Sequence, residues 1–292
     1  NHARWSCLYV NEEDPLTLST LMERIKDYHS QIERAIEVEL DRYKESCFYG
    51  SLRYALEGGK RIRPIILLLS AENTGRSNFD PLPVAVAVEL LHTESIIHDD
   101  ILDHEIMRRN RPAYHIRYGL GASLLTADFV FGIILDIASR YEDKRIAKEL
   151  SSVALCMCEG EFSELGIDPK THQLSWDEYV NLIAQKTASL FEVSAKIGAI
   201  VGGGTEDEIR ALSGYGRLLG MAYQIQDDIQ DWGKKDNVAN ALKMEQDDIP
   251  SYLRKMSELY AVEAKQKLKS LKDTDAKRHL IDLADFMILR RF

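Results

Sequence analysis

Apolar residues recur every three or four positions along most of the chain, which is the spacing that gathers them on one face of an α-helix. The first pattern runs from Leu16 to about Tyr49, and a second, Ser51 to Glu57, stops at the glycine pair Gly58-Gly59. An apolar helix follows the basic sequence KRIRP, and the loop NTGRSNFDP comes next. Since no segment alternates as a strand would, we expect an all-α protein.

The segment 82–107 is the most informative of these patterns. Its VAVAVELL stretch is apolar on every side, which predicts a central, buried helix. Polar side chains then become dense toward its end: Glu89, His92, Thr93, Glu94, Ser95, His98, Asp99, Asp100 and Asp103. A buried helix that turns polar at one end is expected to point that end into a cavity.

The rest of the chain continues the helical pattern without a break that would mark a second domain. Further helices are expected at 113–140, 143–166, 175–203, 205–232, 244–272 and 274–290. There is no linker rich in Pro, Ser or Gly and no short repeat. We therefore expect one all-α domain over residues 15–292, preceded by an N-terminal extension or cloning remnant at 1–14.

Composition and charge narrow the possible functions. Of the 292 residues, 45% are hydrophobic and 29% charged, as in ordinary globular proteins. A formal net charge of −10 argues against a nucleic-acid partner, which would require a basic surface. No run of eighteen apolar residues predicts a membrane span, and the first residues do not resemble a signal peptide. We expect a cytoplasmic protein whose four cysteines, including the Cys156-x-Cys158 pair, are reduced, buried thiols.

Two similar acidic motifs carry the candidate chemistry: HDDILD at 98–103 and QDDIQD at 226–231. In each motif the first and last aspartates are four positions apart, so they share one face of a helix. Like charges at this spacing repel each other, and a bound cation would compensate for the repulsion. Carboxylate oxygens without His or Cys favour Mg²⁺. The alternative to a metal site is that both motifs are acidic helix ends exposed to solvent. The occurrence of the same motif twice, each time after an apolar helix, argues against this alternative.

Basic residues lie where a metal-bound diphosphate would need them. Lys60, Arg61 and Arg63 follow the Gly-Gly turn, and the pair Arg108-Arg109 lies shortly after Asp103. Arginine side chains suit phosphate oxygens because their planar forks donate two parallel hydrogen bonds. Each basic cluster alone is typical of a solvated helix end. Together with the acidic motifs, they predict a site that holds two diphosphates.

Five motifs in order resemble those of the trans-type prenyl-diphosphate synthases: GGKRIRP, LHTESIIHDDILDHEIMRRNRP, QKTASLF, YQIQDDIQD and, more weakly, LADFMILRRF. The resemblance runs from about Ser51 to Gly233. It implies helices surrounding a deep apolar cavity, a homodimer, and an Mg²⁺-dependent prenyltransferase. Such an enzyme condenses isopentenyl diphosphate with an allylic diphosphate to give a longer trans-polyprenyl diphosphate.

The resemblance also implies a role for each matching residue. Asp99 and Asp103, opposed by Asp227, would coordinate Mg²⁺ on the allylic diphosphate. Asp100, counted among the catalytic residues, would support them, as would Asp228 and Asp231. Arg108 and Lys186 would bind that diphosphate, and Thr187 and Gln224 would face the allylic carbons. Lys60, Arg63, His92 and Arg109 would hold isopentenyl diphosphate. His92 lies seven positions before Asp99, two helical turns along nearly the same face, which favours substrate contact; His98 is expected to be structural.

The chain departs from the family pattern at two places. Asn110 stands where members usually have glycine, and asparagine tolerates the left-handed conformation that such a turn needs. After Gly233 the usual loop is missing, and NVANALKM resembles the start of the next helix. Either the loop is deleted or a stretch is absent from this sequence; the second is favoured, so Lys234 and Lys235 are not assigned to the site.

The residues before Asp99 bear on product length. Short-chain relatives carry bulky aromatic residues four or five positions before the first aspartate, where this chain has Ser95 and Glu94. Deeper turns carry Leu91, Val88, Ala87 and Val84, and Phe129 and Phe131 are candidates for a deeper floor. We therefore expect a product longer than farnesyl, geranylgeranyl or above.

Two other functions are compatible with part of the pattern. A class I terpene cyclase shares the helical fold and the first acidic motif, but it would need neither the second motif in this form nor GGKRIRP. A regulatory subunit of a heteromeric synthase would be expected to have lost acidic residues, and both motifs are intact here.

Overall fold

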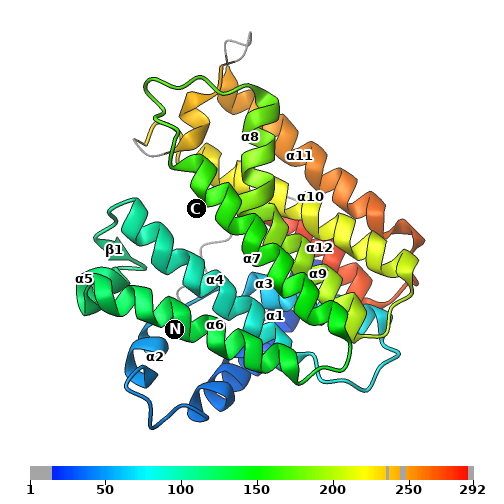
Figure 1. Ribbon diagram of the computed structural model, residues 1–292. Helices are drawn as coiled ribbons and strands as arrows, with labels where there is room; N and C mark the ends of the chain where they lie inside the picture. Colours follow the sequence, from blue (N-terminus) through cyan, green and yellow to red (C-terminus); the bar gives the residue numbers. More distant parts are fainter. Residues whose placement is uncertain (1–14, 235–236, 244–247, 289–292) are drawn as a thin grey trace.

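The computed structural model describes residues 15–234, 237–243 and 248–288, and in this part the protein is an all-α bundle, as expected (Figure 1). The predicted extension at 1–14 lies outside the described residues. The α-helices are α1 (Pro15–Asp41), α2 (Tyr49–Leu56), α3 (Ile62–Thr74), α4 (Leu82–Leu102), α5 (Tyr114–Tyr118), α6 (Leu120–Ser139), α7 (Lys144–Glu164), α8 (Trp176–Ile183), α9 (Ser189–Val201), α10 (Glu206–Gln230), α11 (Ile249–Lys267) and α12 (Asp275–Ile288). A π-helical turn, η1 (Ala184–Ala188), joins α8 to α9, and two 3₁₀ turns, η2 (Val238–Ala241) and η3 (Leu268–Ser270), flank α11.

Helix α4 lies at the centre of the bundle, as its uniformly apolar first half predicts. Every residue from Val84 to Leu91 is buried. Helices α1, α3 and α6 pack against it, so the polar end that begins near His92 is held in a fixed position. The central helix therefore runs from the core to a partly exposed acidic end, where Asp100 is buried and Asp103 is exposed.

The other wall of the bundle is formed by α9, α10 and α11, which pack against each other in sequence (Figure 1). Both α8 and α10 begin with a capping box, in which a hydroxyl at the helix start and a glutamate three positions later bond each other's backbone N–H: Ser175 with Glu178, and Thr205 with Glu208. These caps fix where each helix starts and so which of its residues face inward.

Several boundaries differ from the sequence-based expectations. The helix expected over 82–107 ends at Leu102, and a short hairpin follows it, with β1 (Met107–Arg108) paired to β2 (Arg111–Pro112). The helix expected over 175–203 is interrupted by the π turn. The segment NVANALKM was expected to begin the next helix, but its residues Val238–Ala241 form the 3₁₀ turn η2, and α11 starts at Ile249.

Two expectations about burial also change. Cys47 and Cys158 are exposed and Cys156 is half-buried, so the prediction of buried thiols is wrong for the cysteines that the structure describes. Helix α6 is the one helix in the described ranges that is long and apolar enough to cross a membrane, and 39% of its most apolar window is buried. Its inner face packs in the core through Val130, Ile133 and Ile137.

Candidate active site

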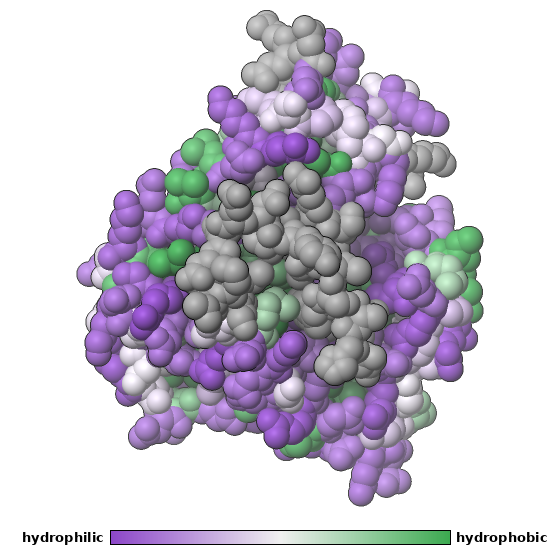
Figure 2. Space-filling model, turned by 180° about the vertical axis from the view of Figure 1, so that it is seen from behind, coloured by the Kyte–Doolittle hydropathy of each residue, from purple (hydrophilic) through white to green (hydrophobic). Residues whose placement is uncertain are grey.

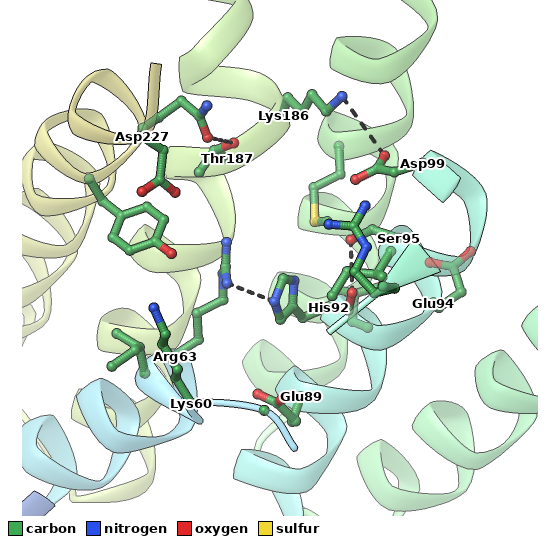
Figure 3. A pocket seen from close by; sticks show the side chains of 18 of the residues that line it. Lys60, Arg63, Glu89, His92, Glu94, Ser95, Asp99, Lys186, Thr187 and Asp227 are labelled. Carbon is green, nitrogen blue, oxygen red and sulfur yellow. Dashed lines mark hydrogen bonds and ion pairs between the residues drawn. The ribbon is translucent and has the colours of Figure 1, made fainter. Parts of the chain in front are cut away.

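A large cavity of about 2440 Å³ opens between α4, α7, α10 and the loop that precedes α3. It brings together eleven of the twelve residues to which the sequence analysis gives a metal, substrate or catalytic role: Lys60, Arg63, His92, Asp99, Asp103, Arg108, Arg109, Lys186, Thr187, Gln224 and Asp227. The supporting residues Asp228 and Asp231 also line it. Figure 3 shows Asp99 and Asp227 on opposite walls, with Lys186 and Thr187 between them.

The first acidic motif lies at the end of α4. Asp99 and Asp103 both line the cavity, and Asp103 caps the helix. Burial raises the pKa of Asp99 to about 8; the nearby Lys186, which opposes this rise, and Glu161, which adds to it, are the next largest influences. Lys186 therefore offsets only part of the cost of ionising this carboxylate, and a further cation would reduce that cost.

Asp100 takes a different position from its neighbours. It is 1% exposed and does not line the cavity; instead its carboxylate accepts a hydrogen bond from Arg108 Nε at 2.7 Å. Residues adjacent in a helix point about 100° apart, and here Asp99 faces the cavity while Asp100 is turned into the core. In this structure Asp100 therefore holds the Arg108 guanidinium at the cavity rim, and the catalytic assignment made from the motif has no support in its position.

The second acidic motif lies on α10. Asp227 lines the cavity opposite Asp99, while Asp228 is buried beneath it and accepts hydrogen bonds from the Tyr179 hydroxyl and from Gln224 Nε2, the latter at 3.0 Å. Burial is the main cause that raises the pKa of Asp228 to about 7, although both hydrogen bonds lower it. Gln224 Oε1 accepts a hydrogen bond from the Thr187 hydroxyl at 2.8 Å (Figure 3). One hydrogen-bond network thus connects α10 to α8 and to the π turn.

The π turn between α8 and α9 aims Lys186 into the cavity. Lys186 Nζ lies 2.8 Å from Glu161, 2.6 Å from Glu164 and 3.8 Å from Asp99. π turns are rare and are frequent at functional sites. The extra residue in this turn changes the direction of the following side chains, so Lys186 and Thr187 both face the cavity.

The sequence analysis missed Glu161 and Glu164. Both come from α7, line the cavity and pair with Lys186. Helix α7 approaches the π turn closely because Gly160 has no side chain there: a Cβ at this position would lie 2.7 Å from the backbone nitrogen of Lys186. The sequence signal for these two residues was their spacing, three positions apart and next to a glycine. Acidic pairs with this spacing are common on exposed helices, so the signal did not indicate a site.

The basic groups occupy the opposite end of the cavity. Lys60 and Arg63 come from the loop before α3 and its first turn, and His92 comes from α4. Arg63 Nη1 lies 3.1 Å from His92 Nε2, and its guanidinium stacks 4.6 Å from the centre of the Phe191 ring (Figure 3). Burial, followed by the adjacent Arg63, lowers the pKa of His92 well below its ordinary value. His92 is therefore a neutral hydrogen-bonding group at neutral pH.

The hairpin after α4 supplies two more arginines. Arg109 and Asn110 both have a left-handed backbone, with φ of 52° and 60°. Asn110 therefore adopts the conformation for which glycine is usual, as expected from the sequence. Arg109 Nη1 donates to the Glu57 carbonyl at 2.9 Å, which ties the hairpin to the end of α2 and keeps Arg109 on the cavity wall.

Below the charged groups the cavity wall becomes more apolar. Leu91, Ser95, Phe131, Ala154 and Met157 line it, and no aromatic residue occupies the turn of α4 just before Asp99.

Two expectations about this wall change. Phe129 is not in the wall, because its ring stacks on Phe48 at 4.6 Å between centres in the core. Val84, Ala87 and Val88 are also packed in the core rather than lining the space. His98 was expected to be structural, but it lines the cavity and its Nδ1 lies 3.0 Å from Glu94.

The connection after α10 is short. The Asn237 side chain donates to the Asp228 carbonyl at 2.7 Å, and the Asn240 side chain bonds Gly233 N and the Lys234 carbonyl. Lys234 lines the cavity and pairs with Asp231, whereas Lys235 lies outside the described residues. Within the described residues, the side chains of Asn237 and Asn240 therefore hold this connection against the end of α10.

Comparison with known proteins places this geometry in a family. A family model described as polyprenyl synthetase matches residues 45–280. The geranylgeranyl diphosphate synthase of Methanosarcina mazei is 30% identical over 325 aligned positions, which cover 95% of this chain and 100% of that protein. Since the alignment is longer than this chain, the relative contains positions that have no counterpart here.

Solved structures agree with this result. Geranylgeranyl pyrophosphate synthetase from the archaeon Geoglobus acetivorans superposes with a TM-score of 0.82 at 28% identity, covering 91% of this chain and 99% of that one. The corresponding enzyme from Pyrococcus horikoshii gives 0.83 at 28% identity, covering 94% and 99%. With its helical cavity, paired acidic motifs and basic loop, the chain belongs to the polyprenyl synthetase family and is a prenyltransferase.

Proposed function

We propose that the protein condenses isopentenyl diphosphate with an allylic diphosphate and releases a trans-polyprenyl diphosphate of geranylgeranyl length or longer. The observation that carries this proposal is the arrangement of charge in one cavity: carboxylates on two facing walls at one end, a separate cationic group at the other, and an apolar wall below them. Two different diphosphates and a long hydrocarbon tail would need these three surfaces.

The acidic end is suited to Mg²⁺. Its donors are carboxylates, with the pKa of Asp99 raised to about 8 by burial, so a cation would relieve the cost of ionising it. Among the described residues, no three Asp, Glu, His or Cys side chains converge closely enough to hold a metal by themselves. Diphosphate oxygens and water would complete the ligand set, which is the usual mode for Mg²⁺. When bound, the ion would neutralise charge on the departing diphosphate.

Side chains of the protein would bind the metal ion and both diphosphates. We assign Asp99, Asp103 and Asp227 to the metal, and Lys186 and Arg108 to the allylic diphosphate. Lys60, Arg63, His92 and Arg109 would hold isopentenyl diphosphate at the other end of the cavity. Fixed cationic donors stabilise charge that develops on a leaving group without reorganising. Thr187 and Gln224, which bond each other, would present oxygen atoms toward the allylic carbons and exclude water from them.

The direct test is condensation of radiolabelled isopentenyl diphosphate with dimethylallyl, geranyl and farnesyl diphosphate, followed by chromatography of the products. We expect Mg²⁺-dependent chain extension that EDTA abolishes. Hydrocarbon release from an allylic diphosphate alone would instead indicate a cyclase. Absence of any condensation by the full-length protein would reject the proposal, and a farnesyl-only product would reject the proposed length.

We further propose that the protein acts as a homodimer through the outer faces of α6 and α7. Leu124, Leu125 and Leu135 on α6, and Leu155 and Phe162 on α7, are each more than half exposed, although large apolar side chains are usually buried. A second copy of the chain would cover them, which also explains a helix apolar enough to resemble a membrane span. Sedimentation of the purified protein in aqueous buffer tests this: a dimer is expected, and a monomer would contradict it.

A further inference from the structure

The loop that precedes α3 is built around a buried arginine in the wall of the cavity. Arg61 is 2% exposed, and its backbone is left-handed, with φ of 55°. A non-glycine residue in this conformation persists when the surroundings determine it. Lys60 precedes Arg61 directly and Arg63 lies two positions later, so the conformation of Arg61 sets where both cationic side chains point.

Three acceptors hold the Arg61 guanidinium. Nε lies 2.7 Å from Glu33 on α1, Nη1 lies 2.6 Å from Glu89 on α4, and Nη2 donates to the Leu56 carbonyl at the end of α2. Glu89 is itself 2% exposed, so its pairing with Arg61 is fully shielded from water. Breaking one partner of such a pair leaves a buried charge without compensation.

The glycine before Lys60 is required by the same contacts. A Cβ on Gly59 would lie 2.5 Å from Arg61 Nη1 and 2.9 Å from Glu89 Oε1. The carbonyl of Gly59 meets His29 Nε2 at 3.1 Å. The loop is thus packed directly on the ion pair, with no room for a side chain between them.

We propose that Glu89, acting through Arg61, is a positioning residue for the site that binds the second diphosphate. The inference rests on the proposed function, since that function assigns Lys60 and Arg63 to isopentenyl diphosphate. Helix α4 contacts the loop twice, through Glu89 to Arg61 and, one turn later, through His92 to Arg63. The same helix carries Asp99, ten residues or about 15 Å beyond Glu89. The pair therefore fixes the basic loop to the helix that carries the first acidic motif.

Glu89→Gln tests the proposal, with Glu39→Gln as the matched control. Glu39 is also a buried glutamate, 5% exposed, and is held by both terminal nitrogens of Arg140 at 2.6 and 2.7 Å, but it does not line the cavity. We expect E89Q to raise the KM for isopentenyl diphosphate about tenfold and to change the KM for the allylic substrate less than twofold. E39Q should lower the melting temperature to a similar extent and leave both KM values unchanged.

A second measurement separates this proposal from the proposed function. Binding of inorganic pyrophosphate is measured by calorimetry in EDTA, which removes the metal ion that would hold a diphosphate at the acidic end. We expect the wild type to bind and E89Q to bind about tenfold more weakly. If the wild type binds and E89Q weakens binding but no condensation occurs, the positioning role stands and the proposed function fails. If condensation occurs and E89Q behaves like E39Q in both assays, the positioning role alone is overturned.

If E89Q does not fold, Glu33→Gln can be used to test the same positioning role. Glu33 is half-exposed, so its loss should cost less stability, yet it holds the same guanidinium. We expect the KM for isopentenyl diphosphate to rise two- to fourfold. An unchanged KM in E33Q, or an equal rise in both KM values, would contradict the role.

Discussion

The buried carboxylate of Asp228 should make the metal-free protein less stable as the pH rises. Its pKa is raised from the ordinary value of 3.8 to about 7, first by burial and further by the neighbouring Asp227. Between these two pH values the folded protein holds a proton that the unfolded chain has released. Folding stability therefore falls with rising pH in this window, and the loss is complete above about pH 8.

The size of the effect follows from the pKa difference. Each tenfold change in proton affinity corresponds to about 1.4 kcal/mol, so the loss from Asp228 is about 4 kcal/mol. For a chain of this size, this corresponds to a fall in melting temperature of roughly 10 °C. Asp99, whose pKa is raised to about 8, adds to the loss in the same direction. His92 acts in the opposite sense, because its lowered pKa adds stability as the pH rises to about 6.5.

The assay is thermal unfolding in EDTA between pH 5 and 9, for the wild type and for Asp228→Asn. Asparagine is neutral throughout, so between pH 5 and 9 the variant should lose less stability than the wild type by about 3 kcal/mol, because about two of the three pKa units by which Asp228 is shifted lie in this range. The contributions of Asp99 and His92 are common to both proteins and cancel in the comparison. Mg²⁺ with pyrophosphate should restore stability at pH 8, because cations favour ionised carboxylates. Equal pH dependence of the two proteins would refute the reasoning.

Three other changes test separate parts of the structure. Gly160→Ala places a methyl group 2.7 Å from the Lys186 backbone nitrogen; the overpacking should cost about 1–3 kcal/mol and lower kcat about tenfold, measured by unfolding and steady-state kinetics. Ser95→Phe should shorten the main product by about one isoprene unit in chromatography, since one helical turn rises about 5 Å; an unchanged product would show that this face does not line the tail. Leu125→Glu should convert the proposed dimer to monomer in sedimentation, while Leu259→Glu on the exposed part of α11 should not.

Periodicity and motif spacing were sufficient to predict the helical fold and most of the cavity wall. They failed where the direction of a side chain depends on tertiary packing. Asp100 shares a motif with Asp99 but points about 100° away around the helix, into the core. The π turn that directs Lys186 inward leaves no mark in the hydrophobic pattern. One extra residue turns the following side chains by about 100°, but Ile183, Ala184 and Ala188 are all buried, so no polar face reveals the change of phase.

Residues brought together from distant segments were the hardest to predict. Glu161 and Glu164 carry no motif of their own, and their relevance appears once α7 lies against the π turn at Gly160. The pairing of Arg61 with Glu89 joins positions 28 residues apart, one in the loop before α3 and the other on α4. Local sequence could identify each of these side chains as charged, but not as partners.

Helix α4 separates two properties that an enzyme of this kind has to control. Under the proposed function, Glu89 and Asp99 set the spacing between the two ends of the reaction centre, and Leu91 and Ser95, which lie between them on the same helix, line the cavity where the tail would lie. Substitutions of Leu91 or Ser95 are then expected to change how much hydrocarbon fits without moving Glu89 or Asp99.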